Sequence, residues 1–203
     1  MSPSKRLFDI VFALFLILFL LPVIAVVAAL CLILEGRPVL YLSERMHSPS
    51  RGFTLIKFRT MRVSSENTGV TGGDKSDRVS RFQNILRKTR LDELPQLFNI
   101  IFGHMSFVGP RPPLRVYVED YPELYGKVLQ SRPGITGLAT LRFHEHEESL
   151  LAQTDTSKQT DAVYRNRCIP RKATLDLIYQ RNASLCFDMA LMFETAKKPF
   201  RDH

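Results

Sequence analysis

An uninterrupted apolar run near the N-terminus constrains this 203-residue chain more than any other feature. Residues 10–34 carry no charge, and about 25 apolar residues suffice for a helix to cross a bilayer. The run is too long for the apolar part of a cleavable signal peptide, and no small-residue cleavage site precedes Glu35 and Arg37. The sequence therefore predicts a membrane segment that is kept in the mature protein.

Two paths through the membrane fit this run. A single spanning helix is the simpler one. However, Pro22 lies almost midway, where a proline removes a hydrogen bond and bends a helix. Each half of the run is about 12 residues, roughly 18 Å as helix, which is enough to enter one leaflet and return. Positive charges flank both ends of the run, at Lys5, Arg6, Arg37, Arg45 and Arg51.

Because positive charge favours the cytoplasmic side, both ends of the run are drawn to that side. We therefore favour a re-entrant hairpin with its bend at Pro22, with both termini in the cytoplasm. The prediction divides the chain into this membrane hairpin, residues 1–36, and a cytosolic membrane-associated catalytic domain, residues 37–203.

Periodicity in the remainder of the chain predicts an α+β fold that is predominantly helical. Residues 39–42 and 53–58 are β-prone and separated by turn residues, so they predict a short β-hairpin. Residues 79–86 and 94–102 have helical spacing, and residues 184–196 form an apolar helix followed by lysines. Amphipathic helices of this kind are expected at the membrane interface, around the compact catalytic domain.

The net charge of the chain restricts the kinds of partner that the domain is expected to bind. Lys and Arg number 28 against 20 Asp and Glu, a formal net charge of +8. A basic surface indicates anionic partners such as nucleic acid, an anionic membrane or phosphorylated substrates. The sequence has no helix-turn-helix pattern and no aromatic platform for single strands, so nucleic acid is not expected. Three widely separated cysteines match neither a disulfide framework nor a metal site, which favours a reducing compartment.

Two adjacent carboxylates, Asp92 and Glu93, lie between an arginine-rich stretch and the segment Gly109–Pro112. We interpret Asp92 as the N-cap of the helix over residues 94–102. A helix N-terminus and nearby cations also keep a carboxylate ionised, which is its nucleophilic form. An acidic pair in a basic setting suits phosphoryl chemistry, in which stabilisation of charge provides most of the catalysis.

Two proline-containing segments carry candidate phosphate ligands. Arg111 lies between Pro110 and Pro112, whose fixed φ angles present its guanidinium from a stiff backbone, and a planar fork matches phosphate oxygens. The segment from Arg132 to Gly137 has a similar character, with hydroxyl and N–H donors in a turn. Taken alone, each is also compatible with a solvated arginine on a turn.

Two other segments look like known motifs but do not match them. The glycine-rich run Gly69–Ser76 has Asp74 where a phosphate-binding loop needs glycine, so we interpret residues 64–77 as a loop or lid. The run His144–Glu148 offers no evident third metal ligand, and a solvated acidic patch is the simpler interpretation.

Several motifs in one order give the chain a clear family resemblance. They are Lys5–Asp9, Lys57–Met61, Leu86–Ile100, Gly103–Pro112 and Arg132–Ala139. With these motifs the chain resembles the small monotopic phosphoglycosyl transferases of bacteria over roughly its whole length. Each motif is weak alone, but the ordered set is specific. The chain departs from the family pattern at Gln83, Arg90 and Thr140, where sugar choice or helix packing could differ.

The resemblance implies an enzyme of the bacterial inner membrane that uses Mg²⁺. It would move a sugar 1-phosphate from a UDP-sugar to polyprenol (undecaprenyl) phosphate, the first membrane step of glycoconjugate assembly. Asp92 would attack the β-phosphorus and release UMP, forming a covalent intermediate, and Glu93 would help Asp92 to hold the metal. A homodimer is possible. Candidate phosphate and substrate contacts are Lys57, Arg87, Arg111, Pro112, Arg132 and Thr136.

Two alternatives stay open at this stage. One is a non-catalytic, membrane-tethered module that binds anions, which would not need Asp92. The other is a metal-dependent hydrolase of nucleotide sugars, which would release UMP without a lipid acceptor. The sequence does not identify the sugar, whose recognition we expect in the loops over residues 64–77 and 144–167.

Overall fold

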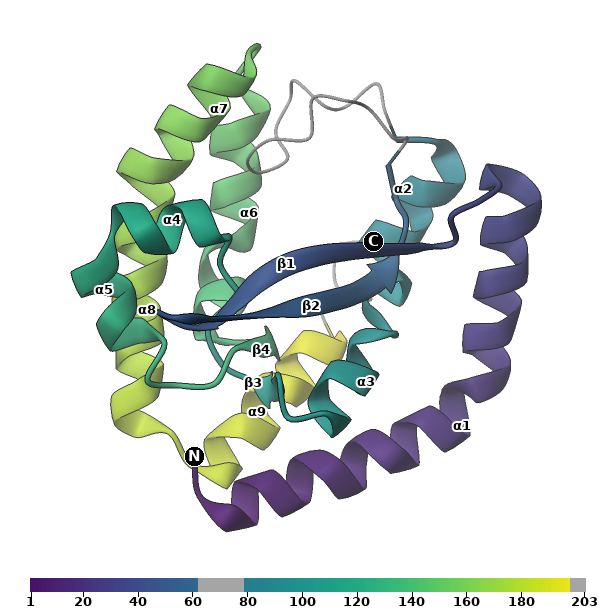
Figure 1. Cartoon of the computed structure of the whole chain (residues 1–203), viewed down its shortest axis with the longest axis horizontal. Helices are drawn as coiled ribbons and strands as arrows, with labels where there is room; N and C mark the ends of the chain where they lie inside the picture. The colour runs from purple at the N-terminus through teal and green to yellow at the C-terminus, as the bar shows by residue number, and fades with distance from the viewer. Residues whose placement is uncertain (62–78, 198–203) are drawn as a thin grey trace.

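The computed structural model describes residues 1–61 and 79–197 and is predominantly helical, with two small two-stranded sheets (Figure 1). This confirms the predicted α+β class. The loop expected over residues 64–77 lies outside the described residues.

The described elements are α1 (Pro3–Glu35), β1 (Leu40–Ser48), β2 (Arg51–Phe58), α2 (Arg81–Lys88), the 3₁₀ turn η2 (Leu91–Glu93), α3 (Gln96–Ile101), β3 (Ser106–Val108), α4 (Arg115–Asp120), α5 (Pro122–Val128), β4 (Gly134–Thr136), α6 (Leu138–Ala152), α7 (Ser157–Val163), the π-helical turn η3 (Tyr164–Cys168), α8 (Ile169–Asn182) and α9 (Leu185–Lys197).

Helix α1 contains the whole apolar run that the sequence analysis singled out. Among the described residues it is the one helix long and apolar enough to cross a membrane. It continues through Pro22 without interruption, so the expected break is a bend inside one helix. Figure 1 shows α1 changing direction part-way along, which is the ordinary effect of an internal proline. The re-entrant path of this bent helix stays a prediction.

The two arms of α1 pack on different parts of the protein. Ala13, in the first arm, joins a core cluster with residues of β2, α3, β3, α8 and α9. Val27 and Cys31, in the second arm, pack with Phe58 of β2 and Leu86 of α2. Most other apolar side chains of α1 are exposed, including Leu18 at 77%. A contiguous apolar surface of this kind needs a membrane or a partner to cover it.

Buried polar contacts fasten the N-terminal end of α1. Lys5 binds the carboxylate of Asp188 on α9, which also accepts a 2.7 Å hydrogen bond from the hydroxyl of Tyr179 on α8. Arg6 donates two hydrogen bonds, of 2.7 and 2.8 Å, to carbonyl oxygens of α3. The motif that precedes the apolar run therefore bonds α1 directly to α3 and α9, and through Asp188 to Tyr179 of α8.

The C-terminal end of α1 is held by a second set of contacts. Glu35 accepts hydrogen bonds from Ser80 and from Gln83, the latter at 3.1 Å. Arg59 donates to the carbonyl oxygens of Glu35 and Gly36 at 2.7 and 3.1 Å. Gln83, one of the departures from the family pattern, thus contributes to helix packing, because it joins α2 to α1.

Strands β1 and β2 form the predicted hairpin with longer strands than expected. The side chain of Asn99 on α3 is almost fully buried and bonds to the edge of β2. It accepts from the N–H of Ile56 at 3.0 Å and donates to the carbonyl of Thr54 at 2.7 Å. These bonds satisfy backbone groups that would otherwise be unpaired, and they set Lys57 beside the turn that carries the acidic pair.

The second sheet explains why glycines recur in two of the sequence motifs. Strands β3 and β4 are parallel, and the chain continues from them with a very close backbone approach. A Cβ atom at Gly109 would lie 2.1 Å from the carbonyl oxygen of Arg132, and one at Gly134 would lie 2.2 Å from the nitrogen of Gly109. Only glycine fits at these two positions, so the segment 132–137 supports the loop that bears Arg111.

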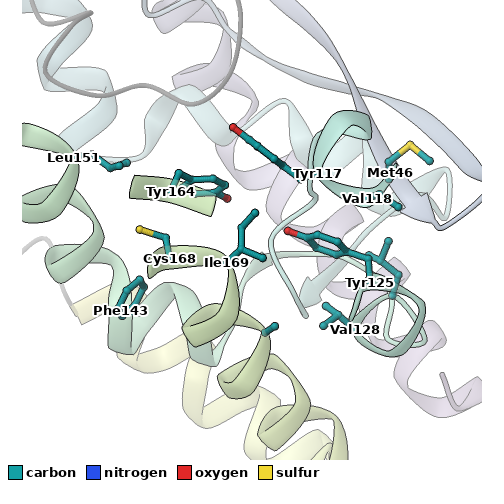
Figure 2. Packing of buried hydrophobic residues seen from close by; sticks show 12 residues of the cluster. Met46, Tyr117, Val118, Tyr125, Val128, Phe143, Leu151, Tyr164, Cys168 and Ile169 are labelled. Carbon is teal, nitrogen blue, oxygen red and sulfur yellow. The ribbon is translucent and has the colours of Figure 1, made fainter. Parts of the chain in front are cut away.

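The largest buried cluster joins β1 to the helices of the second half of the chain. Figure 2 shows Met46 of β1 beside Val118, with the ring of Tyr117 directed toward that of Tyr164. The two ring centroids are 4.9 Å apart. This cluster holds α4 to α8 against the hairpin. It forms the wall of the domain opposite α1 (Figure 1).

Candidate active site

The acidic pair lies in the turn η2 and not at a helix cap. Arg90 precedes this turn in the left-handed conformation, with φ of 56°. Helix α3 begins only at Gln96, with Pro95 in the cap position and no side-chain cap, so the predicted capping role of Asp92 is wrong. Asp92 is instead 6% exposed inside the turn. The tight turn points its carboxylate into the protein because the helix starts later than the sequence pattern indicated.

The fold brings five of the predicted site residues together. Glu93 pairs with Arg111 at 3.4 Å, and Arg90 contacts its other oxygen at 3.4 Å. Lys57 on β2 and Arg87 on α2 both lie close enough to Asp92 to influence its ionisation. Two carboxylates from one turn therefore lie near Arg90, which precedes the turn, and near cations from three other segments of the chain.

Burial sets the ionisation of Asp92. Loss of solvent, followed by the neighbouring charge of Glu93, raises the pKa of Asp92 to about 6, against the opposing effect of Lys57 and Arg111. A carboxyl group with this pKa is about nine-tenths ionised at pH 7. Asp92 is thus a basic, weakly solvated carboxylate that still carries charge at neutral pH, which suits a nucleophile.

Glu93 has the opposite character. Burial by itself would raise its pKa, but Arg111, Arg90 and Lys57 outweigh burial and hold the pKa of Glu93 below its usual value. In return, Glu93 raises the pKa of Arg111. Burial lowers the pKa of Lys57, and Asp92 partly offsets that effect. Adjacent carboxylates whose pKa values are moved apart are suited to different roles.

The structure adds residues that sequence reasoning did not assign to the site. Lys172 of α8 is buried and binds both carboxylate oxygens of Glu147 at 2.9 Å, with its ammonium 5.2 Å from the ring centroid of Tyr164. Glu147 is therefore not part of a solvated patch, as the run His144–Glu148 suggested. Glu147 is one of the groups that raise the pKa of Arg111. The charge of Arg111 in turn tends to lower the pKa of Lys172. No local pattern could have found them, since α6 and α8 meet only in the tertiary structure.

Other predicted contacts lie elsewhere. Arg132 lies near Gly103 and Arg6, and burial followed by the charge of Arg6 lowers the pKa of Arg132, while Asp9 opposes this effect. Thr136 is buried, and its hydroxyl is 2.6 Å from that of Thr195 on α9. The structure does not bring these two side chains to the acidic pair, so their role in substrate binding stays a prediction. Pro112 is buried beside Arg111 and presents its carbonyl to Arg45.

The acidic pair is the candidate metal site. In the part of the chain that the structure describes, no group of three or more His, Cys, Asp or Glu side chains is arranged to hold a metal ion. Mg²⁺, however, commonly binds one or two carboxylates and takes its other ligands from water and substrate phosphates. Asp92 and Glu93 supply the oxygen donors that this mode of binding requires.

Comparisons with known proteins agree with these observations. The UDP-glucose:undecaprenyl-phosphate glucose-1-phosphate transferase of Klebsiella pneumoniae is 34% identical over 200 residues, covering 97% of this chain but 40% of that protein. The chain thus spans about two fifths of the length of this relative. The exopolysaccharide production protein PSS of Rhizobium leguminosarum bv. phaseoli is 36% identical over 200 residues, covering 94% of this chain and 92% of that protein.

A third relative acts on a different sugar. The UDP-N-acetylgalactosamine-undecaprenyl-phosphate N-acetylgalactosaminephosphotransferase of Aeromonas hydrophila is 32% identical over 199 residues, covering 95% of this chain and 43% of that protein. The sequence model of the bacterial sugar transferases matches residues 1–202, essentially the whole chain. With that match, the ordered motifs and the site they build, the chain belongs to the bacterial sugar transferase family.

Proposed function

We propose that this protein transfers a sugar 1-phosphate from a UDP-sugar to polyprenol phosphate through a covalent intermediate on Asp92. The observation that carries the proposal is the buried, basic carboxylate of Asp92, surrounded by cations from several elements. Relatives named as UDP-sugar:undecaprenyl-phosphate transferases support the same reaction class. Both substrates are anions, so a carboxylate nucleophile can approach them only where positive charge offsets the repulsion.

In the first half-reaction an oxygen of Asp92 forms a bond to the β-phosphorus of the UDP-sugar. The bond between that phosphorus and the bridging oxygen breaks, and UMP leaves with the electron pair. Lys57, Arg87 and Arg111 lie where they can stabilise the charge that develops on the phosphoryl oxygens.

In the second half-reaction a phosphate oxygen of polyprenol phosphate attacks the same phosphorus. The bond to Asp92 breaks, which regenerates the carboxylate and gives a polyprenol diphosphate sugar. Mg²⁺ held by Asp92 and Glu93 would stabilise negative charge on the phosphates as a Lewis acid. Glu93, kept ionised by Arg111 and Arg90, is the better permanent metal ligand of the pair.

The apolar surface supports a membrane-embedded, monotopic arrangement. Besides the exposed apolar side chains of α1, Phe102 after α3 and Phe193 of α9 are each 64% exposed. Lys197 lies 4.2 Å from the ring centroid of Phe193, as expected for an aromatic–lysine pair at the headgroup level. We propose that the bent helix enters and leaves the cytoplasmic leaflet, with α9 lying along the interface.

A single-turnover experiment tests the covalent step. The purified chain is mixed with Mg²⁺ and each of UDP-glucose, UDP-galactose and UDP-N-acetylgalactosamine, without lipid. We expect one UMP per protein with one of these sugars, and a mass increase of one phospho-sugar on the peptide that contains Asp92. Undecaprenyl phosphate should then remove the added mass.

The other outcomes separate the alternatives. Continued UMP release without lipid would identify a hydrolase. UMP release that begins only after lipid is added, without an adduct, would mean direct transfer between the two substrates. No release with any of the sugars, with or without lipid, would leave only an anion-binding module.

Cysteine labelling in intact cells tests the re-entrant path. Single cysteines replace Ser4 and Arg37, both exposed, in a background in which the exposed Cys186 is serine. Because both ends of α1 are proposed to face the cytoplasm, neither cysteine should react with a membrane-impermeant thiol reagent, and both should react after lysis. Labelling of the Ser4 position alone in intact cells would establish a single spanning helix.

A further inference from the structure

Arg45 on β1 is a cation at the edge of the site without a carboxylate partner. Its Nε donates to the hydroxyl of Ser43 at 3.1 Å, and its Nη1 donates to the carbonyl of Pro112 at 3.3 Å. Both acceptors are neutral. Within residues 1–61 and 79–197, Arg45 forms no ion pair with Asp or Glu. A half-buried guanidinium with five donors and only neutral acceptors retains both charge and hydrogen-bonding capacity.

The backbone holds Arg45 next to Arg111. The N–H of Met46 donates to the carbonyl of Pro113 at 3.0 Å, so β1 is bonded to the segment that directly follows Arg111. Burial and then the charge of Arg111 lower the pKa of Arg45, as expected when the fold holds two guanidinium groups near one another. Two like charges brought together by the fold are stabilised when an anion binds between them.

Two neighbouring arginines differ from Arg45 because each is paired with a carboxylate. Arg111 is paired with Glu93, and Arg115 of α4 is paired with the exposed Glu44 of β1. The positive charge of Arg111 is thus largely offset by Glu93, while that of Arg45 is not offset by the described residues. Arg45 is therefore available to bind an anion that enters this part of the site.

We propose that Arg45 binds phosphate oxygens of a substrate together with Arg111, as a substrate-binding residue of the transferase. The shared ligand chemistry is a phosphate group, supplied either by the diphosphate of the nucleotide sugar or by the lipid phosphate. The identification of this phosphate as part of a transferase substrate rests on the proposed function. The anion site itself rests on the arrangement of the two arginines.

A binding measurement tests the anion site without any catalysis. Thermal unfolding of the full chain in detergent is followed with and without millimolar inorganic pyrophosphate, in the absence of Mg²⁺. A charge-assisted hydrogen bond contributes enough that Arg45→Met should weaken binding on the order of 10- to 100-fold. The pyrophosphate-induced rise in melting temperature should therefore disappear in this variant, while Arg115→Met should keep it.

Equal stabilisation of the wild type, Arg45→Met and Arg115→Met by pyrophosphate would overturn the proposal. If the methionine variant does not fold, Arg45→Lys is measured in its place. Lysine keeps the charge but cannot present a planar fork. It should bind pyrophosphate several-fold more weakly than the wild type, and wild-type binding by this variant would equally contradict the site.

Steady-state kinetics then identify the phosphate. A rise in KM for the UDP-sugar alone assigns Arg45 to the nucleotide diphosphate, and a rise in KM for undecaprenyl phosphate alone assigns it to the lipid. A fall in kcat with both KM values unchanged would overturn the proposal, because Arg45 would then act only by positioning Arg111 through Pro112. Failure of every UDP-sugar to react would refute the transferase assignment but leave the pyrophosphate result standing.

Discussion

Asp92→Asn is expected to abolish transfer, lowering kcat by at least about 1000-fold, as is usual when a covalent nucleophile is removed. Asparagine has nearly the same shape, so the packing of the turn Leu91–Glu93 is preserved. Its amide cannot form the bond to phosphorus on which both half-reactions depend. The measurement is release of UMP from the reactive UDP-sugar with undecaprenyl phosphate and Mg²⁺. Wild-type turnover by this variant would end the assignment of Asp92 as nucleophile.

The same substitution should not destabilise the protein, which separates lost chemistry from lost folding. The pKa of Asp92 is raised from 3.8 to about 6 in the folded protein. Protonated Asp92 therefore favours folding below pH 4, and this contribution is lost as pH rises through 6. A shift of that size corresponds to about 3 kcal/mol. Without metal, Asp92→Asn should match the wild type at pH 4 and be more stable at pH 8.

The ionisation of Asp92 also sets the acid side of the pH–rate profile. Since the ionised form attacks, kcat/KM measured at Mg²⁺ concentrations low enough to leave the free enzyme without metal should fall about tenfold per pH unit below 6 and level off above it. Lys57→Gln removes a cation that opposes the rise in pKa, so this limb should move to higher pH. A limb near pH 4 in both proteins would contradict the buried environment described for Asp92.

Asp188→Ala should cause a large loss of stability although Asp188 lies outside the site. Asp188 is 1% exposed and accepts from both Lys5 and Tyr179. Its removal leaves the ammonium group of Lys5 and the hydroxyl of Tyr179 without their partner, and breaking a buried ion pair costs about 3–5 kcal/mol. For a protein of this size, that corresponds to a fall in melting temperature of about 10 °C.

Glu194→Ala provides a matched control on the same helix. Glu194 pairs with Arg142 at 3.0 Å, but both side chains are substantially exposed. Exposed ion pairs contribute about 1 kcal/mol or less, so this variant should melt close to the wild type. Equal melting of the two variants in detergent would mean that the Lys5–Asp188 pair does not fasten α1 to the domain.

Local patterns determined the elements of this protein and the order of its motifs. Twenty-five consecutive residues without charge specify one helix that is long and apolar enough to cross a membrane. Alternation and turn residues specify the β1–β2 hairpin, and helical spacing specifies α2 and α9. The adjacent carboxylates among arginines pointed to the centre of the site, since Lys57, Arg87 and Arg111 do gather around Asp92.

Only the tertiary structure decided how those residues divide their roles. The late start of α3 buries Asp92 and raises its pKa, which no count of neighbouring charges could indicate. The close approach at Gly109 and Gly134 makes the segment with Arg132 a support for the Arg111 loop. Arg45 lies beside the Arg111 loop because the backbone of β1 bonds to that loop. Burial, and charges met across distant segments, depend on how elements pack together, whereas sequence spacing describes a single element at a time.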